Sequence, residues 1–125
     1  MKGLQVLVVD DDRDFAESLA RVFEIEGLRA TLAFTGEAAL THLKHDDIDI
    51  AFMDIALPGL SGIEALRMIH ELRPNMKIVM MTGYITKQYA REARMLGALD
   101  ILQKPFDPLK AIDTIPSQTQ RQGQQ

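Results

Sequence analysis

Four apolar segments of this chain each end in a polar group that could take part in metal or phosphate chemistry. The groups are Asp10-Asp11-Asp12 after residues 4–9, Asp54 after residues 48–53, Thr82 after residues 77–81 and Lys104 after residues 98–103. If these segments are parallel strands, their carboxyl ends share one edge of a sheet, where open α/β sheets place their ligands. Several carboxylates, one ammonium and one hydroxyl could there hold a divalent cation and move a phosphoryl group onto an aspartate.

The composition is that of one ordinary globular domain. The chain has 125 residues, of which 46% are hydrophobic and 26% are charged. A net charge of -4 with scattered basic residues argues against direct nucleic-acid binding. The absence of cysteine excludes disulfides and thiolate chemistry. We find no signal peptide and no apolar run that could span a membrane, so we expect a cytoplasmic protein with no membrane contact.

Strand-like and helix-like patterns alternate five times along the chain. Residues 4–9 are apolar except for Gln5, which is typical of a strand buried on both faces. Residues 12–26 carry apolar side chains at helical spacing, and Gly27 can end that helix. The other predicted strands are residues 28–33, 48–53, 77–81 and 98–103, and the other predicted helices begin near Thr35, Ser61, Thr86 and Asp107.

This alternation predicts right-handed βαβ units. The expected fold is therefore a doubly wound α/β sandwich of three layers, (βα)5, with a five-stranded parallel sheet. We assign residues 1–115 to this domain. Residues 116–125 are polar and rich in glutamine, so we expect a tail or a linker stub there.

Four segments in this order resemble the response-regulator receiver domain, which histidine kinases phosphorylate in two-component signalling. They are VLVVDDD at 6–12, MDIALPGLSG at 53–62, MMTGY at 80–84 and GALDILQKPF at 97–106. The resemblance extends over residues 4–115. It implies a flavodoxin-like sheet with strand order 2-1-3-4-5.

The resemblance also implies roles for the acidic residues. Asp54 matches the phosphoacceptor. Asp11, Asp54 and the backbone carbonyl of Ala56 would bind Mg²⁺ directly, and Asp10 would act mainly through a water molecule. An acidic run before a helix can instead act as a cap, and we assign that role to Asp12, which falls at the cap position. Asp10 and Asp11 are less well explained in this way, because a cap needs only one acid.

The basic and hydroxyl groups match the family as well. Lys104 would pair with a phosphoryl oxygen, Thr82 would donate its hydroxyl to the acyl phosphate, and Pro105 resembles a proline that follows a cis peptide bond in the family. Taken singly, Lys104 could be a solvated lysine and Thr82 an ordinary strand-end residue. Their occurrence together with the three acids favours a site.

One residue departs from the family pattern, and two others hold positions that in the family tune loss of the phosphoryl group. Ile101 stands where the family usually has Tyr or Phe, so the usual coupling between hydroxyl and aromatic ring cannot operate. Ala56 has no side chain to orient an attacking water, and Tyr84 could shield the site. We therefore expect a long-lived phosphoryl state. A short last helix, ended by Pro116, would reduce the usual partner surface.

The leading hypothesis is a signalling switch without an external enzymatic substrate. A sensor histidine kinase or phosphotransfer domain would phosphorylate Asp54, and an unknown downstream protein or a covalently linked output domain would respond. Phosphorylation-dependent homodimerisation stays open. One alternative is a pseudo-receiver that binds partners without phosphorylation. Another is a haloacid-dehalogenase-like phosphatase, which needs a second Asp where this chain has Ala56.

Overall fold

The computed structural model describes residues 3–117 and 119, and these form the predicted α/β sandwich. The five strands are parallel and lie in the order β2-β1-β3-β4-β5, which confirms the predicted topology. The strands are β1 (Gln5–Val9), β2 (Arg29–Ala33), β3 (Ile50–Asp54), β4 (Lys77–Thr82) and β5 (Asp100–Gln103). The helices are α1 (Arg13–Ile25), α2 (Gly36–His45), α3 (Gly62–Leu72), α4 (Lys87–Met95) and α5 (Pro108–Asp113).

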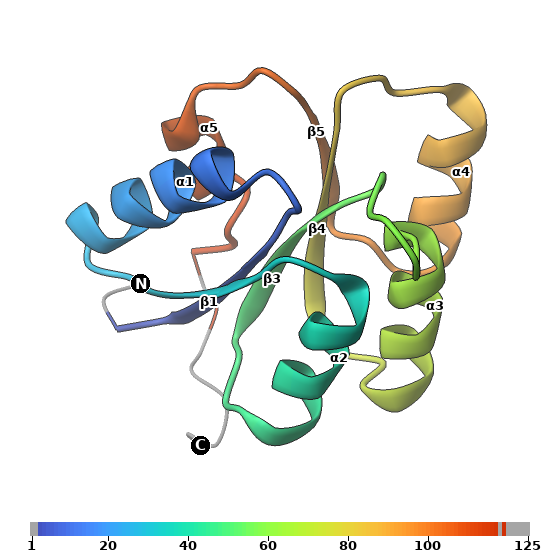
Figure 1. Cartoon of the computed structure of the whole chain (residues 1–125), viewed down its shortest axis with the longest axis horizontal. Coiled ribbons are helices and arrows are strands. Elements are labelled where there is room, and N and C mark those ends of the chain that lie inside the picture. The colour runs from blue at the N-terminus through green and yellow to red at the C-terminus, as the bar shows by residue number, and fades with distance from the viewer. Residues whose placement is uncertain (1–2, 118, 120–125) are drawn as a thin grey trace.

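The helices cover both faces of the sheet. Figure 1 shows α1 and α5 on one face and α2, α3 and α4 on the other. Alternate residues of β1 divide between the two faces: Val6 and Val8 pack toward α1 and α5, and Leu7 and Val9 pack toward the opposite helices. The central strand β3 is buried over its whole length. Burial of each large apolar side chain contributes roughly 1.5–3 kcal/mol.

The register of the sheet brings the chemical groups to one edge. Val9 pairs with Met53, and Thr82 pairs with Gln103, so neighbouring strands end at nearly the same level. The loops that follow β1, β3, β4 and β5 therefore meet at the carboxyl edge. This is the edge at which the sequence places its polar groups.

Every helix begins at a side chain that caps it. The caps are Asp12, Thr35, Ser61, Thr86 and Asp107, each of which accepts a hydrogen bond from a backbone N–H in the first turn. A cap of this kind stabilises a helix by about 1 kcal/mol. Gly27 has a φ of 92°, and it follows α1 as predicted. These local signals fix where each loop of the carboxyl edge ends.

The bounds of the strands differ from the sequence prediction by one or two residues. Strand β3 begins at Ile50 and includes Asp54 as its last residue, and β5 begins only at Asp100. Among the residues of α4, all of which the structure describes, only Ala93 is buried. Of the predicted tail, residues 118 and 120–125 lie outside the described residues. Within the described part of the chain, no helix has the length and apolarity needed to cross a membrane.

Candidate functional site

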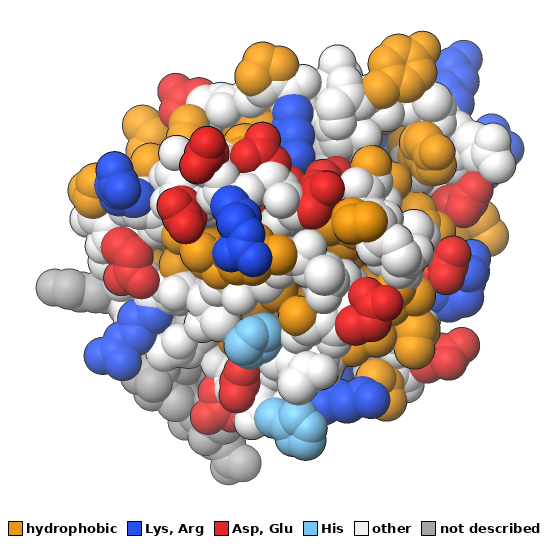
Figure 2. Space-filling model, in the orientation of Figure 1, with side chains coloured by type: hydrophobic (Ala, Val, Ile, Leu, Met, Phe, Trp, Pro, Cys, Tyr) orange, Lys and Arg blue, Asp and Glu red, His pale blue; other side chains and the backbone are white. Residues whose placement is uncertain are grey.

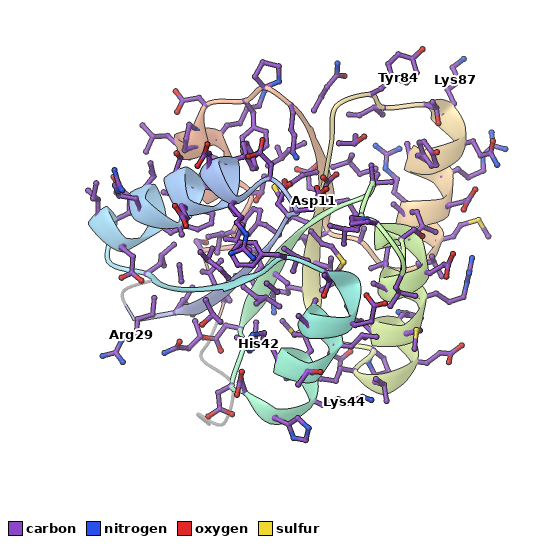
Figure 3. All side chains as sticks on the ribbon, viewed as in Figure 1. Asp11, Arg29, His42, Lys44, Tyr84 and Lys87 are labelled. Atoms are coloured by element: carbon purple, nitrogen blue, oxygen red, sulfur yellow. The ribbon has the colours of Figure 1, made fainter. Side chains whose placement is uncertain are left out.

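Three carboxylates converge at the carboxyl edge of the sheet. Asp10, Asp11 and Asp54 each offer an oxygen atom, and these oxygens all lie within 4.8 Å of one another. Asp10 is fully buried and Asp54 is 6% exposed, whereas Asp11 is exposed. Figure 3 shows Asp11 at the turn between β1 and α1, and Figure 2 shows acidic side chains gathered near the start of α1. Carboxylates this close repel one another, so the cluster favours a bound cation.

The Lys104 ammonium lies against two of these carboxylates. Its Nζ donates to Asp10 Oδ2 at 2.5 Å and to Asp54 Oδ2 at 3.2 Å, and the side chain is 21% exposed. The backbone N–H of Lys104 donates to the Thr82 carbonyl at 2.7 Å, which fixes the start of the loop after β5. The peptide bond from Lys104 to Pro105 is cis, as the resemblance implies.

Burial and charge act in opposite directions on this ion pair. Burial raises the pKa of Asp10 above its usual 3.8, although the hydrogen bond from Lys104 and the Asp12 backbone N–H oppose that shift. Burial alone would lower the pKa of Lys104, but the hydrogen bond to Asp10 and the negative charges of Asp54 and Asp10 raise it above 10.5. The ammonium is therefore firmly charged at neutral pH and partly neutralises the acidic cluster.

Short backbone contacts hold Asp54 in place. Its Oδ1 accepts from the Ala56 N–H at 3.1 Å, and the Ile55 N–H donates to the Met81 carbonyl at 2.9 Å. The Gly62 N–H donates to the Ile55 carbonyl at 2.9 Å, which seats the start of α3 directly on the end of β3. A Cβ atom at Gly62 would lie 2.1 Å from the Asp54 carbonyl oxygen, so only glycine fits there.

The donor set fits a hard divalent cation. All three clustered side chains offer carboxylate oxygens, the ligand type that Mg²⁺ prefers, and the exposed Asp11 leaves room for retained water. No nitrogen or sulfur ligand joins the cluster within the described residues. The residues present therefore match the metal that the sequence predicted.

Thr82 lies at the same edge, but its hydroxyl is engaged elsewhere. The Oγ1 atom donates to the Tyr84 carbonyl and accepts from the Tyr84 N–H, each at 3.1 Å, and Thr82 is buried. The Tyr84 side chain is 72% exposed and points away from Asp11 in Figure 3. It does not shield the acidic cluster here, because the loop after β4 directs the ring outward.

Two contacts of the site were not predicted from the sequence. The centroid of the Phe15 ring, on α1, lies 4.4 Å from Lys104 Nζ. Gly62 was not singled out, although its close approach to Asp54 shapes the loop after β3. Phe15 stands three residues after the cap Asp12, and this spacing places it in the first turn beside the acidic run.

The fold and the site define a receiver domain. The chain belongs to the response regulator receiver domain family, whose model matches residues 6–115. It is thus a receiver module of two-component signal transduction.

The relatives of this chain differ widely in length, and the chain spans only part of most of those named here. The transcriptional regulatory protein FixJ of Azorhizobium caulinodans is 35% identical over 124 residues, which cover 99% of this chain and 59% of FixJ. The chain spans only 24% of the response regulator protein FleR of Pseudomonas aeruginosa. The sporulation initiation phosphotransferase F of Bacillus subtilis is 33% identical over 86% of this chain and 86% of its own length.

Solved structures share the fold closely. A CheY-like receiver domain protein of Methanospirillum hungatei has a TM-score of 0.86 and 31% identity, over 90% of each chain. A response regulator protein of Burkholderia pseudomallei, solved with a phosphorylated aspartic acid, a calcium ion and citrate, has a TM-score of 0.85 and 27% identity. This match covers 93% of the present chain and 68% of that one.

Proposed function

We propose that Asp54 accepts a phosphoryl group from the phosphohistidine of a sensor histidine kinase or phosphotransfer domain, and that partners read the resulting change. The observation that carries this proposal is the Lys104 ammonium, 3.2 Å from Asp54 Oδ2, beside the carboxylate cluster that Asp54 forms with Asp10 and Asp11. A phosphorylated aspartate in the related Burkholderia pseudomallei protein supports it. The reaction would take place in the cytoplasm.

The transfer step needs positioning more than acid–base chemistry. An Asp54 carboxylate oxygen attacks phosphorus, the P–N bond to the donor imidazole breaks, and its electron pair remains on that nitrogen, which takes a proton from solvent. Charge spreads over the phosphoryl oxygens in the transition state. Lys104 can neutralise part of it, because its ammonium already lies beside the attacking carboxylate.

The acidic cluster would hold Mg²⁺ during this step. Asp11, Asp54 and the backbone carbonyl of Ala56 would bind it directly, and Asp10 would bind through a water molecule. When bound, the ion supplies positive charge toward the phosphoryl oxygens. Asp54 Oδ1 already accepts the Ala56 N–H at 3.1 Å, so this loop is folded close to the carboxylate before any ligand arrives.

Thr82 would link the chemistry to a conformational change. A phosphoryl group on Asp54 would offer the Thr82 hydroxyl a charged acceptor, and a hydrogen bond to a charged group is stronger than one to a carbonyl. The hydroxyl would then exchange its bond to Tyr84 for one to the phosphoryl group. The loop before α4 would be free to rearrange, and a downstream protein, an output domain or a second copy of the chain would respond.

The proposal is tested by intact mass spectrometry after incubation with acetyl phosphate and Mg²⁺. Wild type should gain one phosphoryl group, and Asp54→Ala should gain none. Asp47→Ala is the matched control, because Asp47 is an exposed aspartate in the loop before β3, and it should be labelled like wild type. Labelling that persists in Asp54→Ala would refute the assignment. A folded wild-type protein that binds Mg²⁺ but gains no phosphoryl group would favour the pseudo-receiver.

A further inference from the structure

The Lys104 ammonium has a third neighbour besides its two carboxylates. Its Nζ lies 4.4 Å from the centroid of the Phe15 ring, in the geometry of a cation–π contact. The lysine side chain is 21% exposed, so this contact lies in a partly desolvated setting. Lysine has a flexible four-carbon stem, so its position depends on such contacts.

One contact positions the backbone of Phe15 and another positions its ring. The Asp12 carboxylate accepts a hydrogen bond from the Phe15 N–H at 3.1 Å, which holds the first turn of α1. Phe106, two residues beyond Lys104, meets the ring edge-on, with centroids 5.7 Å apart and planes at 85°. Figure 1 shows α1 and α5 side by side, so this aromatic pair lies where the first and last helices pack together.

These contacts form a closed circuit of four residues. Lys104 Nζ donates to Asp10 Oδ2, and Asp10 Oδ1 accepts from the Asp12 N–H at 3.0 Å. Asp12 Oδ1 accepts from the Phe15 N–H, and the Phe15 side chain returns to Lys104. Asp54 is not part of this circuit of contacts. The ammonium can therefore exchange its longer contact, to Asp54 at 3.2 Å, for a phosphoryl oxygen without leaving the site.

We propose that Phe15 is a positioning residue that holds the Lys104 ammonium at the acidic cluster and thereby speeds phosphoryl transfer to Asp54. This inference rests on the proposed function. Phe15→Leu keeps an apolar side chain but removes the π face, so transfer from acetyl phosphate should slow by roughly three- to thirtyfold, the range expected for one partly desolvated cation–π contact. Phe15→Tyr keeps the π face and should restore most of the rate.

Phe34→Leu is the matched control. The Phe34 ring carries the Arg13 guanidinium at 4.0 Å, so the same substitution there removes a cation–π contact that does not involve Lys104. The rate of this variant should equal that of wild type. If Phe15→Leu and Phe15→Tyr slow transfer equally, or if Phe34→Leu slows it as much as Phe15→Leu does, the π face of Phe15 is not the cause and the inference is wrong.

A second readout does not depend on phosphorylation. In protein labelled at lysine with ¹³C, the Lys104 ε-methylene protons should be shifted upfield by the Phe15 ring, relative to those of the exposed Lys44. The shift should persist in Phe15→Tyr and disappear in Phe15→Leu. If wild type is not phosphorylated, the proposed function fails, and this spectrum alone decides whether Phe15 holds Lys104. An unchanged Lys104 signal in Phe15→Leu overturns the inference whatever the rates are.

Discussion

Gly62 allows a severe test of how the site is built. It is the first residue of α3, and a Cβ atom there would lie 2.1 Å from the Asp54 carbonyl oxygen and 2.7 Å from the Ile55 Cα. Carbon atoms in favourable contact are about 3.5–4.0 Å apart. Both obstructing atoms belong to the backbone and cannot rotate away, so Gly62→Ala must separate α3 from the end of β3.

The cost can be worked from these contacts. Overpacking of this kind costs about 1–3 kcal/mol. The Gly62 N–H donates to the Ile55 carbonyl at 2.9 Å, and loss of that bond leaves a polar group unpaired at about 1–3 kcal/mol. Alanine recovers up to about 1 kcal/mol through its higher helix propensity. We expect Gly62→Ala to lower the free energy of unfolding by about 3 kcal/mol and to slow labelling of Asp54, whose backbone must move.

Urea unfolding followed by circular dichroism measures this change. Gly83→Ala is the control, because a Cβ atom at Gly83 meets nothing within 4 Å, and it should stay within about 0.5 kcal/mol of wild type. A Gly62→Ala variant within about 1 kcal/mol of wild type would show that α3 can yield without cost. The reasoning from the close contact would then be refuted.

Two further predictions concern charge at the site. Mg²⁺ at ten times its Kd should raise the free energy of unfolding by about 1.4 kcal/mol. Asp11→Asn should abolish this gain without destabilising the metal-free protein, since Asp11 is exposed. Equal shifts of the urea midpoint in wild type and Asp11→Asn would contradict the assignment of Asp11 as a metal ligand. Because the pKa of Lys104 is raised in the folded protein, its stabilising contribution is complete below 10.5 and is lost as the pH rises through the folded value. Lys104→Met should therefore be less stable than wild type at neutral pH, and the difference in unfolding free energy between the two proteins should narrow above pH 10.5. If urea titrations give the same difference on both sides of that pH, the charge of Lys104 contributes nothing to stability.

The sequence predicts the fold well because its signals are local and repeated. Apolar strands, capped helices and Gly27 each follow from neighbouring residues, and their alternation leaves few topologies. The convergence of Asp10, Asp11, Asp54 and Lys104 could be predicted for the same reason. Parallel strands end at one edge, so groups that follow the strands must meet there.

Other parts of the site depend on contacts between distant segments. The approach of the Phe15 ring to Lys104 depends on how α1 packs beside the loop after β5, which no local pattern specifies. The lack of room for a Cβ atom at Gly62 depends on the spacing between α3 and β3. The two bonds of the Thr82 hydroxyl to the Tyr84 backbone depend on the course of one loop. The periodicity of the sequence could not predict these contacts, because tertiary packing determines them.

The loop after β4 offers another route for the conformational change in a chain that has Ile101 in place of the usual aromatic residue. Ile101 is half-buried against the core beneath α4 and has no hydroxyl, so it cannot exchange a hydrogen bond with Thr82. In this chain the groups tied to Thr82 are instead the N–H and carbonyl of Tyr84, two residues before the α4 cap Thr86. If phosphorylation draws the Thr82 hydroxyl away, as proposed, the change reaches α4 through the backbone. Since Ala93 alone is buried among the α4 residues, that helix can shift with little loss of packing.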